Sequence, residues 1–202
     1  MIDEEQVWKT IDPEDIWILD KFILSRKLGY RCGPVGMDVP VDDWYIVRPC
    51  KNALGLGLGA TFEYLKAEWN GTDHLTPGYF WCQIFRGRHF SVDYKNGEQV
   101  LCVEGIRDKN HPDLTRWKEW IRRKDVFPLP DILKDYTEKY PYMNCEYVDG
   151  HLIEVHLRLN PDFDYDITHF IPVWEGQDTT PPAGYSYKDY PDIHGRIGAF
   201  VK

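Results

Sequence analysis

The sequence lacks any dense cluster of lysine and arginine. It has 24 Lys and Arg residues against 33 Asp and Glu residues, which gives a formal net charge of −9. Non-specific nucleic-acid binding depends on basic patches that release counterions. The nearest basic run, residues 116–124, is expected to be the solvated face of a helix. We therefore expect no nucleic-acid partner, whereas a small anion such as ATP needs only a few local cations.

Paired cysteines and long apolar runs are also missing. The five cysteines are an odd number, and none belongs to a CxxC pair, which argues against a disulfide framework and a zinc site. No apolar run approaches the ~20 residues that a membrane helix needs. The acidic N-terminal stretch does not have the basic-then-apolar order of a signal peptide. These absences predict no membrane partner and a reducing, cytoplasmic setting.

Aromatic residues and turn formers are abundant instead. Eight Trp, thirteen Tyr and nine Phe, together with 16 Gly and 14 Pro, favour sheets joined by many turns. Strands are predicted over 44–49, 79–85, 89–94, 99–106, 143–148, 152–159 and 196–201, with hairpin turns at Asn96-Gly97 and Asp149-Gly150. Helices are predicted over 13–28, 112–123 and 130–139, while 162–195 gives no clear pattern. The fold class that follows is α+β, dominated by antiparallel hairpins.

The first candidate site is a strand that ends in an arginine and leads into a glycine-rich turn. The strand 44–49 ends with Arg48 and Pro49. The turn then has glycine at every second position: Gly55, Gly57 and Gly59. Glycine lets backbone N–H groups close on phosphates, and the cation balances their charge. No Gly-Lys-Ser/Thr follows, so this is not a P-loop, and a glycine-rich hairpin tip explains the pattern equally well.

The second candidate site is a carboxylate-bearing hairpin. Glu146 and Glu154 lie on neighbouring predicted strands, and Glu154, His156 and Arg158 alternate with apolar residues, so these three share one face of the sheet. Two carboxylates and a histidine could hold Mg²⁺ against ATP phosphates. Histidine is an unusual ligand for Mg²⁺, which prefers oxygen, and the exposed face of a half-buried sheet is the alternative interpretation.

The order of these units resembles the ATP-grasp superfamily of carboxylate–amine ligases. Members typically have a strand ending in Lys-Pro, a glycine-rich loop, a hinge with a pattern like G-x-E-x-S-V-D, then D-G, and a strand reading E-x-N-x-R. The matching stretches here are 47–49, 55–59, Gly87-Arg88-His89-Phe90-Ser91-Val92-Asp93, Asn96-Gly97 and 154–158. The segment from Leu19-Asp20-Lys21 to Leu28-Gly29 is similar to a family segment that precedes the nucleotide site. The resemblance spans roughly residues 15–201.

This resemblance implies an ATP site and a Mg²⁺ site. Arg48 stands where the family usually has a phosphate-contacting lysine, and it delivers its charge as a planar fork. The adenine would dock on the backbone of Cys82, Gln83, Ile84 and Phe85. His89 replaces the acid that commonly contacts the ribose. Glu146 and Glu154 match the two metal-binding acids, and His156 replaces the usual asparagine.

The activity implied is that of an ATP-dependent ligase acting through an acyl phosphate. The substrates would be an unidentified carboxylate and an unidentified amine, with Arg158 at the acyl phosphate or the substrate carboxylate. The alternative is a catalytically inactive nucleotide-binding or protein-interaction module.

The resemblance also implies the domain organisation. We expect one compact ATP-grasp-like domain over 1–202, with two small α+β lobes of largely antiparallel sheets enclosing a nucleotide cleft. The lobes expected are 45–107 and 12–44 plus 108–202. Because the usual N-terminal domain would be lacking, residues 162–195 or a partner protein would supply substrate binding.

Overall fold

The chain folds as two compact units. The structure is a computed structural model that describes residues 4–51, 57–108, 111, 114–164 and 166–202. The first unit comprises Met1–Gly87 and Cys145–Arg158, and the second comprises Arg88–Asn144 and Leu159–Lys202. This grouping differs from the expected lobes, because residues 89–107 pair with strands of the second unit rather than belonging with the first. The expected division into lobes stays a prediction.

The first unit begins with three short helices. They are α1 (Glu4–Thr10), a 3-10 helix (Pro13–Ile18) and α2 (Lys21–Lys27). The continuous helix predicted over 13–28 is therefore wrong in its middle. Asp20 interrupts it, because its carboxylate caps α2 by accepting from the amides of Phe22 and Ile23 at 3.0 Å, and its backbone bridges to Lys51. The predicted stop is confirmed, since Gly29 adopts a φ of 75° just after α2.

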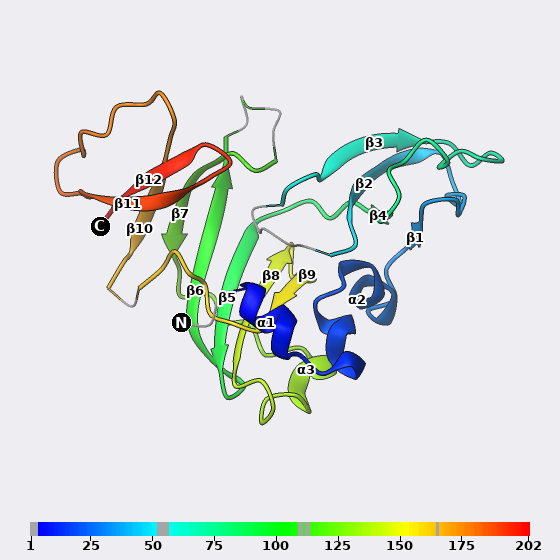
Figure 1. Cartoon of the computed structure of the whole chain (residues 1–202), viewed down its shortest axis with the longest axis horizontal. Coiled ribbons are helices and arrows are strands. Elements are labelled where there is room, and N and C mark those ends of the chain that lie inside the picture. The colour runs from blue at the N-terminus through cyan, green and yellow to red at the C-terminus, as the bar shows by residue number, and fades with distance from the viewer. Residues whose placement is uncertain (1–3, 52–56, 109–110, 112–113, 165) are drawn as a thin grey trace. The chain divides into compact units, whose positions relative to one another are not determined.

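A four-stranded antiparallel sheet completes most of the first unit (Figure 1). Its order is β1-β4-β2-β3, with bounds β1 (Cys32–Pro34), β2 (Asp43–Pro49), β3 (Thr61–Leu65) and β4 (Tyr79–Gln83). One face covers a buried core of Val39, Tyr45, Val47, Leu65, Leu75 and Trp81. Because side chains alternate along a strand, Ile46 and Arg48 of β2 lie on the opposite face.

The second unit contains six consecutive antiparallel neighbours in the order β11-β12-β10-β7-β6-β5. Their bounds are β5 (His89–Lys95), β6 (Glu98–Arg107), β7 (Trp117–Arg122), β10 (His169–Trp174), β11 (Ser186–Ile193) and β12 (Arg196–Val201). Strands β10 and β11 arise from the region that gave no clear pattern. A core of Leu101, Val103, Phe163, Ile167, Phe170 and Ala199 packs on this sheet.

The helix predicted over 112–123 is wrong, because its described part forms β7. The prediction relied on apolar residues at helical spacing, including Trp117 and Ile121. In the sheet, Glu119 faces Ile106 and Trp117 faces Arg107, so Lys118 is an extra residue in a β-bulge. Trp117 and Trp120 can then both pack over Gly105, where an added Cβ would lie 2.7 Å and 2.8 Å from their rings. The extra residue thus places Trp117 and Trp120, three positions apart, on the same face of the sheet, which is the spacing that had predicted a helix.

The remaining predictions hold with shifted ends. The helix predicted over 130–139 is only one turn, α3 (Asp131–Lys134). The carboxylate hairpin is confirmed as β8 (Tyr142–Val148) and β9 (His151–His156), joined at Asp149 and Gly150 with φ values of 52° and 77°. Positive φ at both positions is what the type I′ form of a two-residue hairpin turn requires. The largely antiparallel α+β fold class is confirmed.

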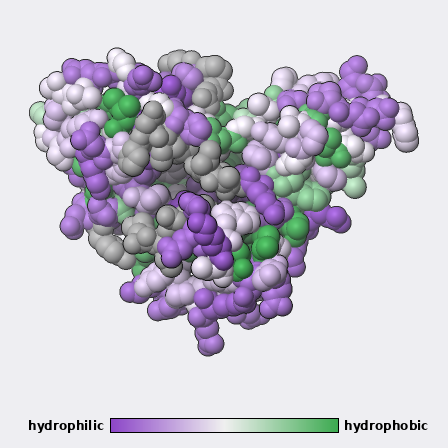
Figure 2. All heavy atoms as spheres, viewed as in Figure 1, coloured by the Kyte–Doolittle hydropathy of each residue, from purple (hydrophilic) through white to green (hydrophobic). Residues whose placement is uncertain are grey.

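Hydrophilic residues cover most of the face drawn in Figure 2, with hydrophobic residues in small separate groups. In the described part of the chain, no helix is both long enough and apolar enough to cross a membrane.

Candidate functional site

Arg48 is a buried cation in the first unit. It lies on β2 opposite Phe80 of β4, is 7% exposed, and places its guanidinium carbon 5.2 Å from the centre of the Phe80 ring. Its Nε is buried and has no hydrogen-bond partner among the described residues. An unpaired buried donor costs about 1–3 kcal/mol. Arg48 therefore carries a hydrogen-bonding capacity that an anionic ligand can use.

Lys21 is a second buried cation in the same unit. It is 3% exposed, and its Nζ lies 3.9 Å from Oε1 of Glu154. Burial lowers the pKa of Lys21 and the charge of Arg48 lowers it further, while Glu154 and Glu146 oppose this. The position of Lys21 is fixed because its amide donates to the carbonyl of Cys50, at 2.7 Å, just after β2.

Lys21 was not among the predicted site residues. The available signal was the Asp20-Lys21 pair in the segment similar to the family segment. Its meaning depends on the pairing of Asp20 with Lys51, which brings α2 to the end of the strand that carries Arg48. The sequence alone does not reveal that pairing.

The predicted metal residues lie on β8 and β9. Glu154 and His156 are 6% and 5% exposed, and Oε1 of Glu154 lies 3.4 Å from Nε2 of His156. Glu146 is half-buried on β8. Because both glutamates act on the pKa of Lys21, the structure brings these carboxylates into electrostatic range of one lysine.

The carboxylates fit Mg²⁺ only in part. Within the ranges that the structure describes, no group of three or more His, Cys, Asp or Glu side chains could hold a metal ion. Mg²⁺ is usually held by one or two carboxylates together with substrate phosphates, rather than by an all-protein cage. Two carboxylates are enough in number for that simpler arrangement, and the binding of Mg²⁺ by Glu146, Glu154 and His156 stays a prediction.

The predicted phosphate loop is described only at its end. Gly55 lies outside the described residues. Gly57 and Gly59 both have a φ of 71°, which favours glycine, and a Cβ on Gly59 would collide with the Tyr79 hydroxyl. The glycines at these two positions are therefore required by the backbone itself, and their contact with phosphate stays a prediction.

The predicted adenine segment comprises the last two residues of β4 and the two that follow it. Cys82 is buried, and Gln83 is fastened to Arg31, because its amide donates to the Arg31 carbonyl at 2.9 Å and its Oε1 accepts from the Arg31 amide at 2.8 Å. Ile84 and Phe85 come next, and Phe85 stacks on His151 with ring centres 4.1 Å apart. These contacts hold the segment in place; its role toward adenine stays a prediction.

The other two predicted residues are placed differently. His89 begins β5 in the second unit, is 7% exposed, and packs against Trp117 at 4.7 Å between ring centres. Arg158 is half-buried, two residues beyond the end of β9. Their contacts with ribose and with acyl phosphate stay predictions.

The Ser-Val-Asp part of the hinge pattern serves packing in the second unit. Nδ2 of Asn144 donates to Oγ of Ser91 at 2.7 Å and to Oδ1 of Asp93 at 2.8 Å. The amide of Asn160 also donates to Asp93, at 2.9 Å. Buried polar groups need such partners, so these residues hold β5 to Asn144 at the start of β8 and to Asn160 beyond β9.

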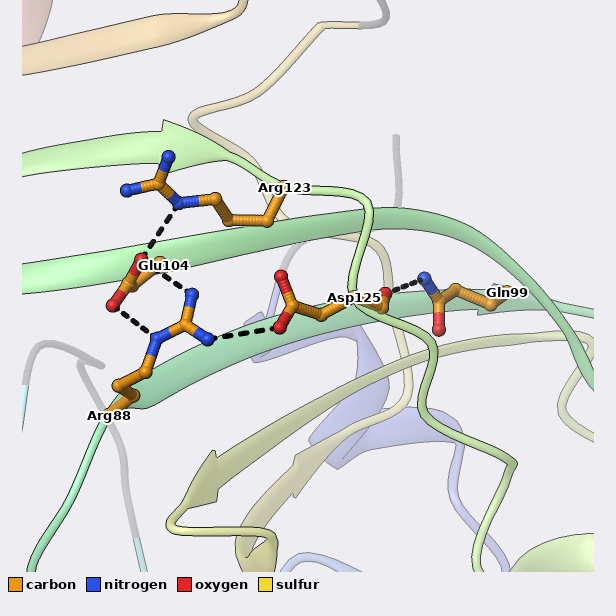
Figure 3. Close-up of polar contacts among 5 residues, drawn as sticks. All are labelled: Arg88, Gln99, Glu104, Arg123 and Asp125. Carbon is orange, nitrogen blue, oxygen red and sulfur yellow. Dashed lines mark hydrogen bonds and ion pairs between the residues drawn. The ribbon is translucent and has the colours of Figure 1, made fainter.

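A second charged cluster lies on the sheet of the second unit (Figure 3). It consists of Glu104, Arg88, Arg123 and Asp125 and is called the Glu104 cluster. Arg88 donates to both carboxylate oxygens of Glu104, at 2.7 and 2.9 Å, and Arg123 donates to Oε2 at 2.8 Å. Arg88 also pairs with Asp125 at 3.0 Å. Hydrogen bonds from Arg88 lower the pKa of Glu104 to about 2, and those from Arg123 assist. Glu104 is thus held as a charged, fully bonded anchor.

No protein-family model and no curated protein matches this sequence. Solved structures do match it at low identity. The carboxyaminoimidazole ribonucleotide synthase from Aspergillus clavatus, complexed with ATP, has a TM-score of 0.57 at 12% identity, covering 98% of this chain and 72% of that protein. The N5-carboxyaminoimidazole ribonucleotide synthetase from Thermus thermophilus has a TM-score of 0.53 at 10% identity, with the same coverage of both chains.

A third match is the L-amino acid ligase from Bacillus licheniformis. Its TM-score is 0.50 at 11% identity, covering 92% of this chain and 66% of that ligase, so the chain spans just under two thirds of its length. The matched proteins are ATP-grasp proteins. At identities this low, the structural match establishes the fold alone, and the activity needs its own test. This chain has the ATP-grasp fold.

Proposed function

We propose that this chain binds ATP and acts as an ATP-dependent ligase that activates a carboxylate for attack by an amine. The observation that carries the proposal is the pair of buried cations in the first unit. Arg48 has an unpaired buried Nε, and Lys21 has a pKa lowered by burial and by the charge of Arg48. Buried like charges are costly without counterions, and triphosphate is a counterion that both could share.

The carboxylates give this site its second requirement. Glu146 and Glu154 would hold Mg²⁺, which supplies charge neutralisation at the phosphate oxygens. Glu154 also keeps Lys21 in place through their 3.9 Å contact. The ATP-bound structural neighbour, carboxyaminoimidazole ribonucleotide synthase, supports ATP as the nucleotide.

The proposed reaction has two steps, formation of an acyl phosphate and its attack by the amine. A carboxylate oxygen of the substrate attacks the γ-phosphorus, the bond to the β-phosphate oxygen breaks, and ADP leaves. The amine nitrogen then attacks the acyl carbon, phosphate leaves with the bonding electrons, and the amine gives up a proton. Arg48 binds and orients the phosphates, and Arg158 is proposed to orient the acyl phosphate. Catalysis of this kind depends mainly on positioning and charge stabilisation.

The test is calorimetric titration of the whole chain with ATP, with and without Mg²⁺. The variant is Glu146→Gln, which removes one proposed ligand at a half-buried position. Glu98→Gln, an exposed carboxylate on β6, is the matched control. We expect binding that requires Mg²⁺, is weakened in Glu146→Gln, and is unchanged in Glu98→Gln. ADP release should then appear when mixtures of carboxylates and amines are supplied.

Two other outcomes would contradict the proposed ligase activity. Binding that ignores Mg²⁺ and Glu146, with no ADP release, would identify a nucleotide-binding module without catalysis. Absence of any ATP binding would remove the nucleotide altogether and leave a module for protein interaction.

A further inference from the structure

Cys32 and Cys82 face each other on neighbouring strands of the first unit. Cys32 on β1 is the register partner of Cys82 on β4. The next pair is hydrogen-bonded, because the amide of Gln83 donates to the carbonyl of Arg31. Paired residues of antiparallel strands alternate in type, so Cys32 and Cys82 form a non-hydrogen-bonded pair with Cα atoms about 4.5 Å apart. That separation lies at the short end of the range a disulfide spans, about 4.4–6.8 Å.

The two thiols are already in contact. Both are free, and their side chains hydrogen bond to each other. Cys82 is 1% exposed, whereas Cys32 is half-buried and reachable from solvent. The pair therefore has one sulfur that an oxidant can reach and a second sulfur directly behind it.

The surroundings of the pair are positively charged. The hydrogen bond from Cys32 lowers the pKa of Cys82, the charge of Arg48 lowers it further, and the pKa of Cys32 is raised by the same hydrogen bond. These opposite directions favour the proton on Cys32 and the thiolate on Cys82. The charges of Arg26 and Arg48 favour the thiolate at Cys32 as well. Thiolates, rather than thiols, are the nucleophiles in disulfide exchange.

We propose that Cys32 and Cys82 form a reversible disulfide between β1 and β4, with a small anionic disulfide such as oxidised glutathione as the oxidant. This inference concerns the sulfur pair and does not depend on the proposed ligase activity. It is also compatible with the reducing setting expected from the sequence, because exposed or short-spanned disulfides are the labile ones.

The exchange occurs in two steps. As Cys32 attacks one sulfur of oxidised glutathione, its proton passes to the Cys82 thiolate, the oxidant's S–S bond breaks, and one glutathione leaves as thiolate. Cys82 then loses its proton and attacks Sγ of Cys32, and the second glutathione leaves. The protein loses two electrons and one proton, and that proton together with one from solvent converts the two glutathione thiolates into thiols.

The other cysteines do not offer this arrangement. Cys102 on β6 faces Val92, and burial raises its pKa to about 12. Cys145 is buried on β8, and burial raises the pKa of Cys50. Cys102 thus lacks a second sulfur across its strand pair, which the proposed exchange needs. Cys102→Ser is therefore a suitable control.

The experiment incubates the whole chain with oxidised glutathione, traps free thiols by alkylation, and maps peptides by mass spectrometry without reduction. We expect one linked peptide pair, Cys32 with Cys82, which dithiothreitol reverses. Cys82→Ser should instead accumulate glutathione on Cys32, since nothing displaces it. Cys32→Ser should leave the buried Cys82 unmodified, and Cys102→Ser should behave like the native chain.

Three results would overturn the proposal. They are a native chain in which both thiols remain free, one in which Cys32 stops at the mixed disulfide, and one in which other cysteines are linked. Cys82→Ala repeats the Cys82→Ser measurement with an apolar side chain, so a folding defect of one variant does not decide the outcome.

Discussion

Two clusters of basic residues and glutamate in this molecule differ in how completely their charged groups are paired. In the second unit, Glu104 accepts three hydrogen bonds from Arg88 and Arg123, on the surface of a sheet. In the first unit, Arg48 is buried with an unpaired Nε, and Lys21 reaches Glu154 only at 3.9 Å. The first arrangement is complete in itself, while the second leaves buried positive charge incompletely balanced.

The difference in pairing supports the proposed functional role of the first-unit cluster and a structural role of the Glu104 cluster. Complete pairing stabilises three neighbouring strands and leaves little capacity for a ligand. Incomplete pairing of buried cations lowers stability, and such groups persist mainly where a ligand completes them. The comparison therefore supports the proposal that the Arg48 cluster, which consists of Arg48, Lys21 and Glu154, binds a ligand, whereas the Glu104 cluster anchors the sheet.

The largest expected effect concerns Glu154 and the stability of the Arg48 cluster. Glu154→Gln removes the partner of buried Lys21, and breaking a buried pair costs about 3 kcal/mol or more. The pKa of Lys21, already lowered, should fall further. The unfolded chain then binds a proton that the folded chain does not, so stability should rise with pH between the lowered pKa and about 10.4. Urea unfolding at several pH values measures both effects.

A double variant supplies the control for this experiment. Lys21→Met with Glu154→Leu replaces the pair by apolar groups and should recover most of the lost stability. Equal losses in the single and double variants would mean that Glu154 stabilises the fold through groups other than Lys21.

The next effect concerns ATP affinity and compares the clusters directly. Arg48→Met removes a buried cation proposed to contact phosphate and should weaken ATP binding by about 30-fold or more, which corresponds to at least 2 kcal/mol. Arg88→Met removes an arginine of the Glu104 cluster and should leave affinity within about 2-fold, because Arg88 is already committed to Glu104 and Asp125. Calorimetric titration measures both. Equal losses would remove the functional distinction between the clusters.

The sequence predicted most of the strands because alternation and turn residues are local signals. The strands at 44–49, 89–94 and 196–201 and the Asp149-Gly150 turn followed directly from such signals. Two helix predictions failed for non-local reasons. The bulge at Lys118 imitated a helical period, and the pairing of Asp20 with Lys51 broke a helix that local propensity favoured.

The candidate site shows the same division. Arg48 and Glu154 could be predicted as candidates because each follows a recognisable local pattern, and their roles stay predictions. Lys21 was missed, because it matters only through a contact with Glu154 far along the chain. The Cys32–Cys82 pair was missed for a similar reason, since it depends on the register of β1 with β4. Long-range pairing, which local patterns do not encode, places these residues.

A smaller effect concerns acid stability of the Glu104 cluster. The pKa of Glu104 is about 2 in the folded chain, below its ordinary 4.5. A carboxyl with a depressed folded pKa contributes stability above its unfolded pKa, and that contribution is lost as the pH falls from about 4.5 to about 2. Glu104→Gln should cost about 1–2 kcal/mol at neutral pH. Its difference from the native chain should shrink across that window in urea unfolding, and a constant difference would contradict the assigned pairing.

The smallest expected effect is the change in unfolding free energy caused by Arg48→Met. The sign of that change distinguishes the two clusters. Methionine keeps an apolar stem against Phe80 and removes the unpaired buried Nε. Relief of a buried, incompletely paired charge, which costs several kcal/mol, should outweigh the loss of a desolvated cation–π contact worth about 2 kcal/mol, so stability should rise by about 1 kcal/mol. Arg123→Met, in the Glu104 cluster, should lower it by a similar amount. If Arg48→Met instead lost about 2 kcal/mol in urea unfolding, Arg48 would be a structural anchor like Glu104, and the unpaired nitrogen would no longer indicate a ligand.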